Sequence, residues 1–275
     1  TLSFLFGFQI YFDFCAYSHI AIGSAKLMGI SFPENFNFPY VAKSPKDFWK
    51  RWHISLSSWL KDYLYIPMGG NRGGSLFSYV SLSLIIVFIY LLSGSLALLF
   101  GILSVIFLTL LLGEIFPRFN KWYLTNINIM LTMLIGGLWH GASWNFVLWG
   151  GLNGLGIVIY KLWKNISPWK NKSKWMYKIL GIIITFNFVT FTRIWFRSGS
   201  INSWDQMDES HNILSEWFTA NEILNQLFFN FQWNLIGDVI SVYSHVFVVI
   251  IIGFLIHFIP EKWKFWYREK FSKSP

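Results

Sequence analysis

Long apolar stretches separated by short polar segments dominate the hydrophobic pattern of this chain. Residues 73–113 and 122–160 contain no Asp, Glu, Lys or Arg, and each is about twice the ~20 residues that one helical crossing of a bilayer needs. We expect the first to form a helical hairpin that turns at Ser93-Gly94-Ser95. The second is predicted to be a hairpin or re-entrant pair around His140. Two shorter apolar runs, at 179–196 and 239–259, are predicted to span the membrane once each.

Charged residues lie between these apolar runs and differ in sign from one segment to the next. The acidic segment, residues 198–234, has five acids and no base, whereas three other segments are basic. Lys and Arg concentrate on the cytoplasmic side of membrane proteins. This pattern predicts that the acidic segment lies outside, with His53 near the cytoplasmic mouth and His140 deep or towards the outer face. The basic segments are 43–72, 161–178 and 262–273.

One basic segment also has a helical pattern. Ser44 suits an N-cap and Pro45 suits the first helical position, so a single helix is predicted from there to Pro67. Its charged and aromatic residues fall on different stripes, which is typical of an amphipathic helix at a membrane interface. His53 borders the apolar stripe and is expected to face protein. The preceding residues 31–43 and the following residues 114–125 are predicted to be loops.

Composition agrees with a membrane protein. The chain is 54% hydrophobic and 13% charged, whereas a soluble domain carries about 25% charged residues. We predict an all-α, polytopic transmembrane helical bundle with an interfacial amphipathic helix and re-entrant or broken segments. The net charge of +9 is explained by cytoplasmic Lys and Arg, so no nucleic-acid partner is expected. The single cysteine, Cys15, excludes an internal disulfide.

Two ionisable residues lie within apolar sequence, where charge is costly and often marks function. Asp13 is expected to face the protein interior or a wet cavity. His140 lies between Gly136-Gly137 and Gly141, which predicts a helix break or very close packing. An equally weighted alternative is that His140 caps a helix end or bonds a backbone carbonyl.

Four stretches in order resemble one family, the membrane-bound O-acyltransferases, and within it the bacterial alginate and peptidoglycan O-acetyltransferases. The resemblance covers residues 8–160 most closely. The four stretches are Phe8-Gln9-Ile10-Tyr11-Phe12-Asp13-Phe14 with Ala21-Ile22-Gly23; Phe32-Pro33-Glu34-Asn35-Phe36-Asn37-Phe38-Pro39-Tyr40; Phe48-Trp49-Lys50-Arg51-Trp52-His53-Ile54-Ser55-Leu56-Ser57 with 62–72; and Gly137-Leu138-Trp139-His140-Gly141-Ala142-Ser143-Trp144.

The resemblance implies a helical bundle around a central funnel in the bacterial inner (cytoplasmic) membrane, crossing it several times. It implies acyl transfer, with an acetyl group favoured, from a cytoplasmic donor to a hydroxyl of an extracytoplasmic polysaccharide such as alginate or peptidoglycan. Acetyl-CoA or an acyl carrier would be the co-substrate, with no bound cofactor. Membrane lipid and an extracytoplasmic acetyltransferase are the other partners it suggests. The family's key histidines map onto His140 and His53.

Two departures from the family pattern stand out. The family usually has an acidic residue where this chain has His19, and an apolar hairpin at 75–112 looks inserted. We expect residues 1–275 to form one membrane-embedded acyltransferase domain, the carboxy-terminal part of a longer protein.

In this interpretation a neutral His140 removes the hydroxyl proton. His53 and Asn145 stabilise the developing negative charge or position the substrates, and Trp139 and Trp144 exclude water. Lys50, Arg51 and Arg72 attract an anionic donor, unless their charge only sets topology. The supporting residues are completed by Asp13 and Asn71.

Three other readings stay open. D-alanyl transfer to teichoic acid lies within the same family. A transporter with a proton relay through Asp13, His53 and His140 is a different class, although no inverted repeat is visible in the sequence. A catalytically inactive scaffold is the third.

Overall fold

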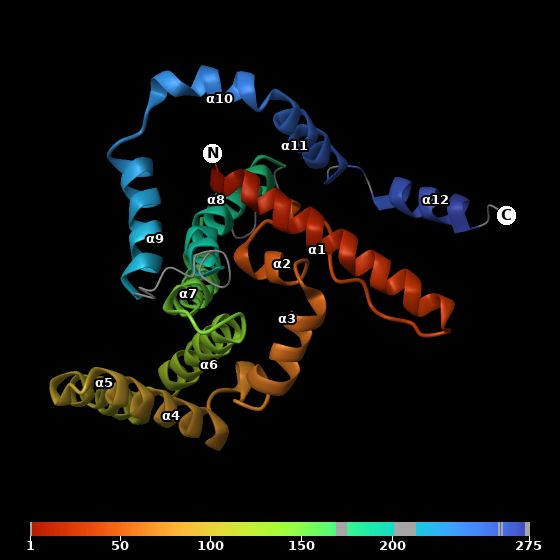
Figure 1. Ribbon diagram of the computed structural model, residues 1–275. Helices are drawn as coiled ribbons and strands as arrows, with labels where there is room; N and C mark the ends of the chain where they lie inside the picture. Colours follow the sequence, from red (N-terminus) through yellow and green to blue (C-terminus); the bar gives the residue numbers. More distant parts are fainter. Residues whose placement is uncertain (1, 169–174, 201–212, 258, 260, 273–275) are drawn as a thin grey trace. The chain divides into compact units, whose positions relative to one another are not determined.

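The computed structural model describes residues 2–168, 175–200, 213–257, 259 and 261–272, and this part of the chain is helical with no strand (Figure 1). The all-α prediction is therefore confirmed. The helices are α1 Leu2–Leu27, α2 Pro45–Trp49, α3 Ile54–Leu60, α4 Leu76–Ser93, α5 Leu96–Ile115, α6 Pro117–Trp139, α7 Trp144–Ile166, α8 Trp175–Ser200, α9 Ile213–Phe228, α10 Ile236–Val242, α11 Ser244–His257 and α12 Glu261–Ser272. Short helical turns are η1 Pro39–Val41, η2 Lys61–Tyr65, η3 Gly70–Arg72 and η5 Trp233–Leu235.

The chain divides into two compact units. The first unit comprises residues 1–52, 172–194 and 207–275. The second unit comprises residues 53–171 and 195–206. Helix α8 therefore contributes residues to both units, and the segment that carries the sequence motifs divides between Trp52 and His53.

The first unit is built around an aromatic core. Phe8 and Tyr11 of α1 pack with Phe36 and Tyr40 of the following loop, and Val189 of α8 completes the contact. Many of these rings meet edge to face, for example Tyr40 and Phe8 at 5.1 Å between centroids. Such contacts add to the stabilisation from burial alone. The loop predicted at 31–43 is confirmed, since its only regular element is η1.

The second unit depends on the crossing of α6 and α7. A Cβ atom on Gly137 would lie 2.3 Å from the carbonyl oxygen of Phe146, and one on Gly150 would lie 2.2 Å from that of Met133. Only glycine permits this approach, which is the close packing that small residues allow between membrane helices. Both expectations for the glycines around His140 are confirmed, because a helix break also lies there.

The predicted single amphipathic helix is wrong. Ser44 does cap it, accepting a hydrogen bond from the Asp47 N–H, and Pro45 is its first residue, but α2 ends at Trp49. The chain turns through residues 50–53 before α3 begins, and His53 adopts a left-handed conformation with φ 45°. A non-glycine residue in this region interrupts a right-handed helix, so the stripes deduced for one helix are not continuous.

Two loop predictions also change. Residues 117–125, predicted to be part of a polar loop, form the first turns of α6, which Pro117 can start because proline suits the first turn of a helix. Gly94, with φ 59°, ends α4 and begins the predicted turn between α4 and α5. The hairpin is confirmed, whereas its status as an insertion stays a prediction.

Among the described residues, α7 and α8 are long and apolar enough to cross a membrane. Their predicted spans are therefore supported. The predicted final span is bent by 83° between 233–242 and 244–256, and is a broken span or a re-entrant segment. Of the predicted acidic loop, residues 201–212 lie outside the described part of the chain, and 213–228 form α9.

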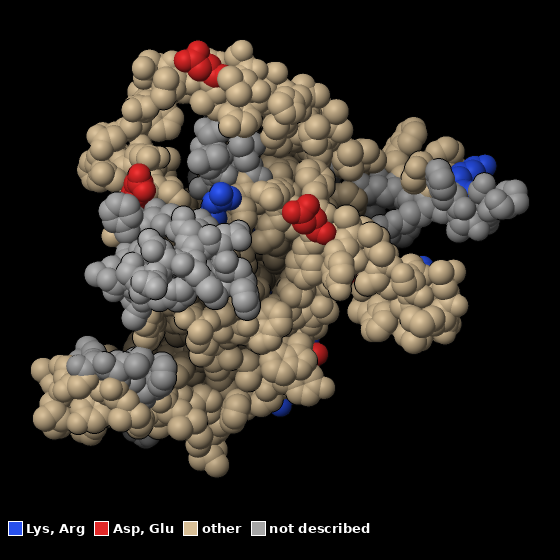
Figure 2. Space-filling model, in the orientation of Figure 1, with Lys and Arg blue, Asp and Glu red and all other residues tan. Residues whose placement is uncertain are grey.

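The surface of this helical chain is largely apolar. Charged residues are sparse on the face that Figure 2 shows, and large apolar side chains such as Leu27, 92% exposed, and Leu91, 72% exposed, project outwards. In lipid, exposed apolar side chains cost nothing, and helices satisfy their own backbone hydrogen bonds. The arrangement is that of a membrane protein.

Candidate active site

His140 lies at the break between α6 and α7. It is the C-cap of α6, and its backbone N–H points to the carbonyls of Gly137 and Leu138. Three residues later Ser143 caps α7, its hydroxyl accepting from the Asn145 N–H at 3.1 Å. The caps on both sides satisfy backbone groups that a helix break leaves free, so the imidazole is presented from a stable turn. The backbone of His140 therefore caps α6, as the alternative in the sequence analysis expected. The cap gives no role to the imidazole ring.

Aromatic rings surround the His140 imidazole, which is half-buried. The centroids of Trp139, Trp149 and Phe196 lie 5.0, 5.1 and 5.1 Å from it, all edge to face. Phe196 comes from the last turns of α8, whereas Trp149 comes from α7. These rings cover part of the imidazole surface.

The Trp139 ring also lies close to His53. Its imidazole centroid lies 6.2 Å from that of Trp139, so the same indole contacts both histidines. Burial lowers the pKa of His53 to about 4, and the ring is therefore neutral near pH 7. The prediction that His53 faces protein is confirmed, because the ring is half-buried.

Asn145, five residues after His140, is a further polar residue near the helix break. The side chain is fully buried, and neither Oδ1 nor Nδ2 has a hydrogen-bond partner among the described residues. A buried amide with no partner is unfavourable and is uncommon in folded proteins. It lies on the first turn of α7, and Trp149 follows it by one turn on the same face.

The exposure of the tryptophans favours residues other than the predicted Trp139 and Trp144 for excluding water. Trp139 and Trp144 are 59% and 42% exposed, whereas Trp149 is 7% exposed. Trp149 and Phe196 therefore cover the imidazole, and the sequence reading missed both. The helical spacing from Asn145 to Trp149 could have indicated Trp149 from the sequence. No sequence signal indicated Phe196, which lies far along the chain.

The basic residues predicted at the cytoplasmic mouth differ in their surroundings. Arg51 donates to an Asp47 carboxylate oxygen at 3.0 Å and to the carbonyl of Asn37 at 3.2 Å, which favours a structural role. Lys50 and Arg72 are exposed.

Asn71 lies in a loop that is held in place by Asn128. Its side-chain oxygen accepts from the Tyr65 hydroxyl at 2.9 Å. The fully buried Asn128 amide donates to the carbonyls of Met68 and Gly73, at 2.8 and 2.9 Å. Asn128 is a further residue that sequence reasoning missed.

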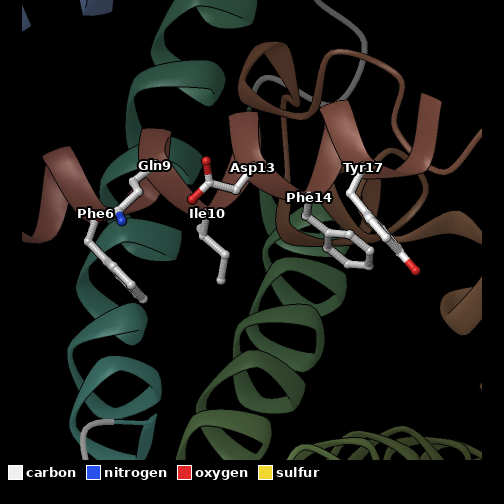
Figure 3. A pocket seen from close by; sticks show the side chains of 6 residues that line it. All are labelled: Phe6, Gln9, Ile10, Asp13, Phe14 and Tyr17. Carbon is white, nitrogen blue, oxygen red and sulfur yellow. The ribbon is translucent and has the colours of Figure 1, made fainter. Parts of the chain in front are cut away.

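Asp13 is exposed on α1 and lines an open pocket of about 350 Å³, with Phe6, Gln9, Ile10, Phe14 and Tyr17 (Figure 3). The carboxylate is exposed and not enclosed by protein, and its expected position in a wet cavity stays a prediction. Asp13 belongs to the first unit and both histidines to the second. A relay through all three stays a prediction.

His19, where the family usually has an acid, is linked to two neighbours. Its Nε2 lies 3.2 Å from a Glu34 carboxylate oxygen, and its Nδ1 lies 3.7 Å from the Cys15 sulfur. Glu34 thus supplies an acidic group beside the position. Cys15 lies in the middle of α1, where helical hydrogen bonds use the backbone N–H groups, so this array offers no backbone oxyanion site.

Helical membrane architecture and a histidine held in an aromatic enclosure define an all-α integral membrane protein with a buried polar site. The chain belongs to the membrane-bound O-acyltransferase family, whose model matches residues 1–110.

Relatives cover the rest of the sequence motifs. The peptidoglycan O-acetyltransferase of Helicobacter pylori is 34% identical over 198 residues, 72% of this chain and 28% of that protein. The probable alginate O-acetylase AlgI of Pseudomonas aeruginosa is 37% identical over 178 residues, 64% of this chain and 25% of that protein. The teichoic acid D-alanyltransferase of Streptococcus thermophilus is 30% identical over 211 residues, 72% of this chain and 41% of that protein. The chain therefore spans well under half the length of these relatives.

Proposed function

We propose that this protein transfers an acyl group, with acetyl favoured, from a cytoplasmic-side donor to a hydroxyl of an extracytoplasmic polysaccharide. One observation carries the proposal: the enclosed His140 imidazole and the fully buried, unpartnered Asn145 amide lie on either side of the same helix break. Acyl transfer to a hydroxyl needs a base and a hydrogen-bond donor for the oxyanion, and these two side chains can supply them.

The proposed reaction has two proton transfers through one imidazole. His140 takes the proton of the acceptor hydroxyl as its oxygen attacks the carbonyl carbon of a thioester donor. The resulting oxyanion accepts a hydrogen bond from Asn145 Nδ2. When the tetrahedral intermediate collapses, the C–S bond breaks, the leaving thiolate takes the proton from the imidazolium, and the ester remains. Trp149 and Phe196 exclude water that would otherwise hydrolyse the donor.

His53 has a supporting role in this proposal. Because its imidazole is neutral near pH 7 and shares Trp139 with His140, it can donate or accept one hydrogen bond without adding charge. It is suited to orient the donor or the acceptor hydroxyl. Trp139 and Trp144, being exposed, are suited to substrate contact.

The substrate class follows from the relatives' names. The names of the O-acetyltransferase relatives support acetyl transfer onto alginate, peptidoglycan or a similar polysaccharide. The proposed donor is acetyl-CoA or an acyl carrier. An extracytoplasmic acetyltransferase is a proposed partner, and the bacterial inner membrane, crossed several times, is the proposed location. D-alanyl transfer to teichoic acid is the second candidate, favoured by the 30% identity to a D-alanyltransferase.

Replacing the base tests the proposal. His140→Ala, expressed in a strain deleted for the gene, is expected to lower ester-bound acetate in the envelope polysaccharide at least 100-fold, because a general base contributes about 10²–10⁴ in rate. Ester-bound acetate and D-alanine are measured in the same alkaline hydrolysate. Loss of D-alanine instead of acetate would select the second candidate.

His245→Ala is the matched control, since His245 is an exposed histidine of α11. It should leave the ester content at the wild-type level. Membrane abundance of each variant is measured by immunoblot. Unchanged ester in a normally inserted His140→Ala protein would overturn the proposal.

A further inference from the structure

The roles proposed for His140, His53 and Asn145 leave one buried guanidinium of the first unit without an assigned role. Arg193 of α8 is only 5% exposed. Its guanidinium carbon lies 4.9 Å from the ring centroid of Trp52, 5.2 Å from that of Tyr40 and 5.9 Å from that of Phe48. These three aromatic residues form a box around the cation, and all of them lie in the stretches that resemble the family.

The box leaves hydrogen-bond donors of Arg193 unused. Nη1 and Nη2 are both buried. The Tyr40 hydroxyl can accept one hydrogen bond from the guanidinium, but one hydroxyl leaves the other N–H donors without a partner among the described residues. Ring faces attract a cation, but they offer no lone pairs to a planar fork of N–H groups. A buried charge is normally compensated by an opposite charge and by hydrogen bonds. Among the described residues, no carboxylate oxygen lies within 4.0 Å of this guanidinium.

The glycine at position 7 leaves room for Nη1. Nη1 lies 2.5 Å from the position that a Cβ atom on Gly7 would occupy, so the guanidinium reaches this point only because residue 7 is glycine. The Tyr40 hydroxyl donates to the Gly7 carbonyl. Burial raises the pKa of the Tyr40 phenol, and the charge of Arg193 and its hydrogen bond to the phenol oppose part of that rise.

The surroundings are electropositive. Between residues 43 and 52 the chain carries four bases and one acid, Asp47, which Arg51 already engages. This segment packs on α8, because a Cβ atom on Gly181 would lie 2.8 Å from the Lys43 carbonyl oxygen. An anion bound at Arg193 would therefore experience additional attraction, which increases with the charge of the anion.

We propose that the Arg193 guanidinium, held in the box of Tyr40, Phe48 and Trp52, binds a phosphate group. Phosphate offers several acceptor oxygens at the spacing of the guanidinium fork and more negative charge than a carboxylate. The phosphate belongs either to a nucleotide-type acyl donor or to a phospholipid headgroup. The site does not depend on acyl transfer by His140.

Two probes distinguish these sources. The full chain is purified in phospholipid-free detergent, and binding of coenzyme A is measured by calorimetry. Binding of phosphatidylglycerol is measured by the change in Tm on titration, with a phosphate-free galactolipid as reference. We expect saturable binding of one probe, weakened at least tenfold in Arg193→Gln and less in Arg193→Lys, which keeps the charge but loses the fork.

Matched variants separate binding from folding. Lys46→Gln removes an exposed charge of the same segment and should bind like the wild type. Gly7→Ala keeps Arg193 but crowds Nη1, and should weaken binding if Arg193→Gln does not fold. His140→Ala should bind normally, so this test is independent of the proposed reaction.

Two results overturn the proposal. One is that neither probe binds the wild-type protein saturably. The other is that Arg193→Gln and Gly7→Ala keep wild-type affinity for both probes. If Arg193 only packs against the box, its variants have a lower Tm but an unchanged affinity for both probes.

Discussion

At the scale of single residues, the site combines a neutral base with an unused amide. His140 is oriented by the caps of two helices, whereas Asn145 is buried with no partner for either polar atom. Stability alone favours an apolar residue at such a position, because burying an unpaired amide costs about 1–3 kcal/mol. An amide retained there is consistent with a functional constraint.

Asn145→Leu tests this constraint. The apolar side chain of similar size removes the unpaired groups, so we expect an unchanged or higher Tm together with loss of acyl ester. Asn145→Ala should also lose activity but lower the Tm, because it leaves a cavity. Tm by differential scanning fluorimetry and ester content are measured on the same preparations. A Leu variant that keeps full activity would show that the amide takes no part in the reaction.

At the scale of helices, the α6–α7 crossing determines where the site forms. Gly137 and Gly150 approach the backbone of the opposite helix so closely that the two helices share one interface. The His140 turn and the first turn of α7 are therefore fixed relative to one another. The hairpin geometry, and not the local sequence around His140 alone, brings Trp149 against the imidazole.

Gly150→Ala is expected to disturb both packing and chemistry. Its new methyl group would overlap the Met133 carbonyl, and overpacking of this kind costs about 1–3 kcal/mol. The Tm should fall and the acyl ester should decrease, because Trp149 moves with its neighbour. Both are measured against wild type.

Gly101→Ala is the control on α5, where an added Cβ meets nothing within 4 Å. Alanine raises helix propensity by about 0.5–1 kcal/mol at an exposed site, so its Tm should stay the same or rise. Equal effects of the two substitutions would argue against a close helix contact.

At the scale of the whole molecule, charge distribution and helix length both indicate a membrane protein. Helices α7 and α8 are long enough to cross the bilayer, and the basic and acidic segments alternate along the chain. Lys and Arg near membrane helices remain on the cytoplasmic side. We therefore expect α2 to lie inside the cell and α9 outside.

Cysteine labelling tests this topology. In a Cys15→Ser background, which has no other cysteine, Glu222→Cys on α9 should react with a membrane-impermeant maleimide in intact spheroplasts. Lys46→Cys on α2 should react only after permeabilisation. Both side chains are exposed, so accessibility within the protein does not decide the result. Labelling of both cysteines from the same side would contradict the predicted orientation.

Local patterns in the sequence determined much of the fold. Apolar run length predicted the hairpins, and glycine content predicted a break and close packing at His140. The cap at Ser44 and Pro45 was correct, because capping depends on neighbouring residues. The end of α2 at Trp49 was not predicted, since the helical periodicity continues through residues 50–53 and only the backbone of His53 interrupts it.

Contacts between residues that are distant along the chain were decided by the tertiary structure alone. The sequence by itself marked His140 as a candidate site residue, because an ionisable group within apolar sequence is costly. The resemblance to the family marked His53. Only the tertiary structure showed that Phe196 covers His140, that Asn145 is unpartnered and that Arg193 lies among three aromatic rings. The physical reason is that burial and hydrogen bonding depend on which segments meet in space, and hydrophobic periodicity specifies only the faces that each helix offers.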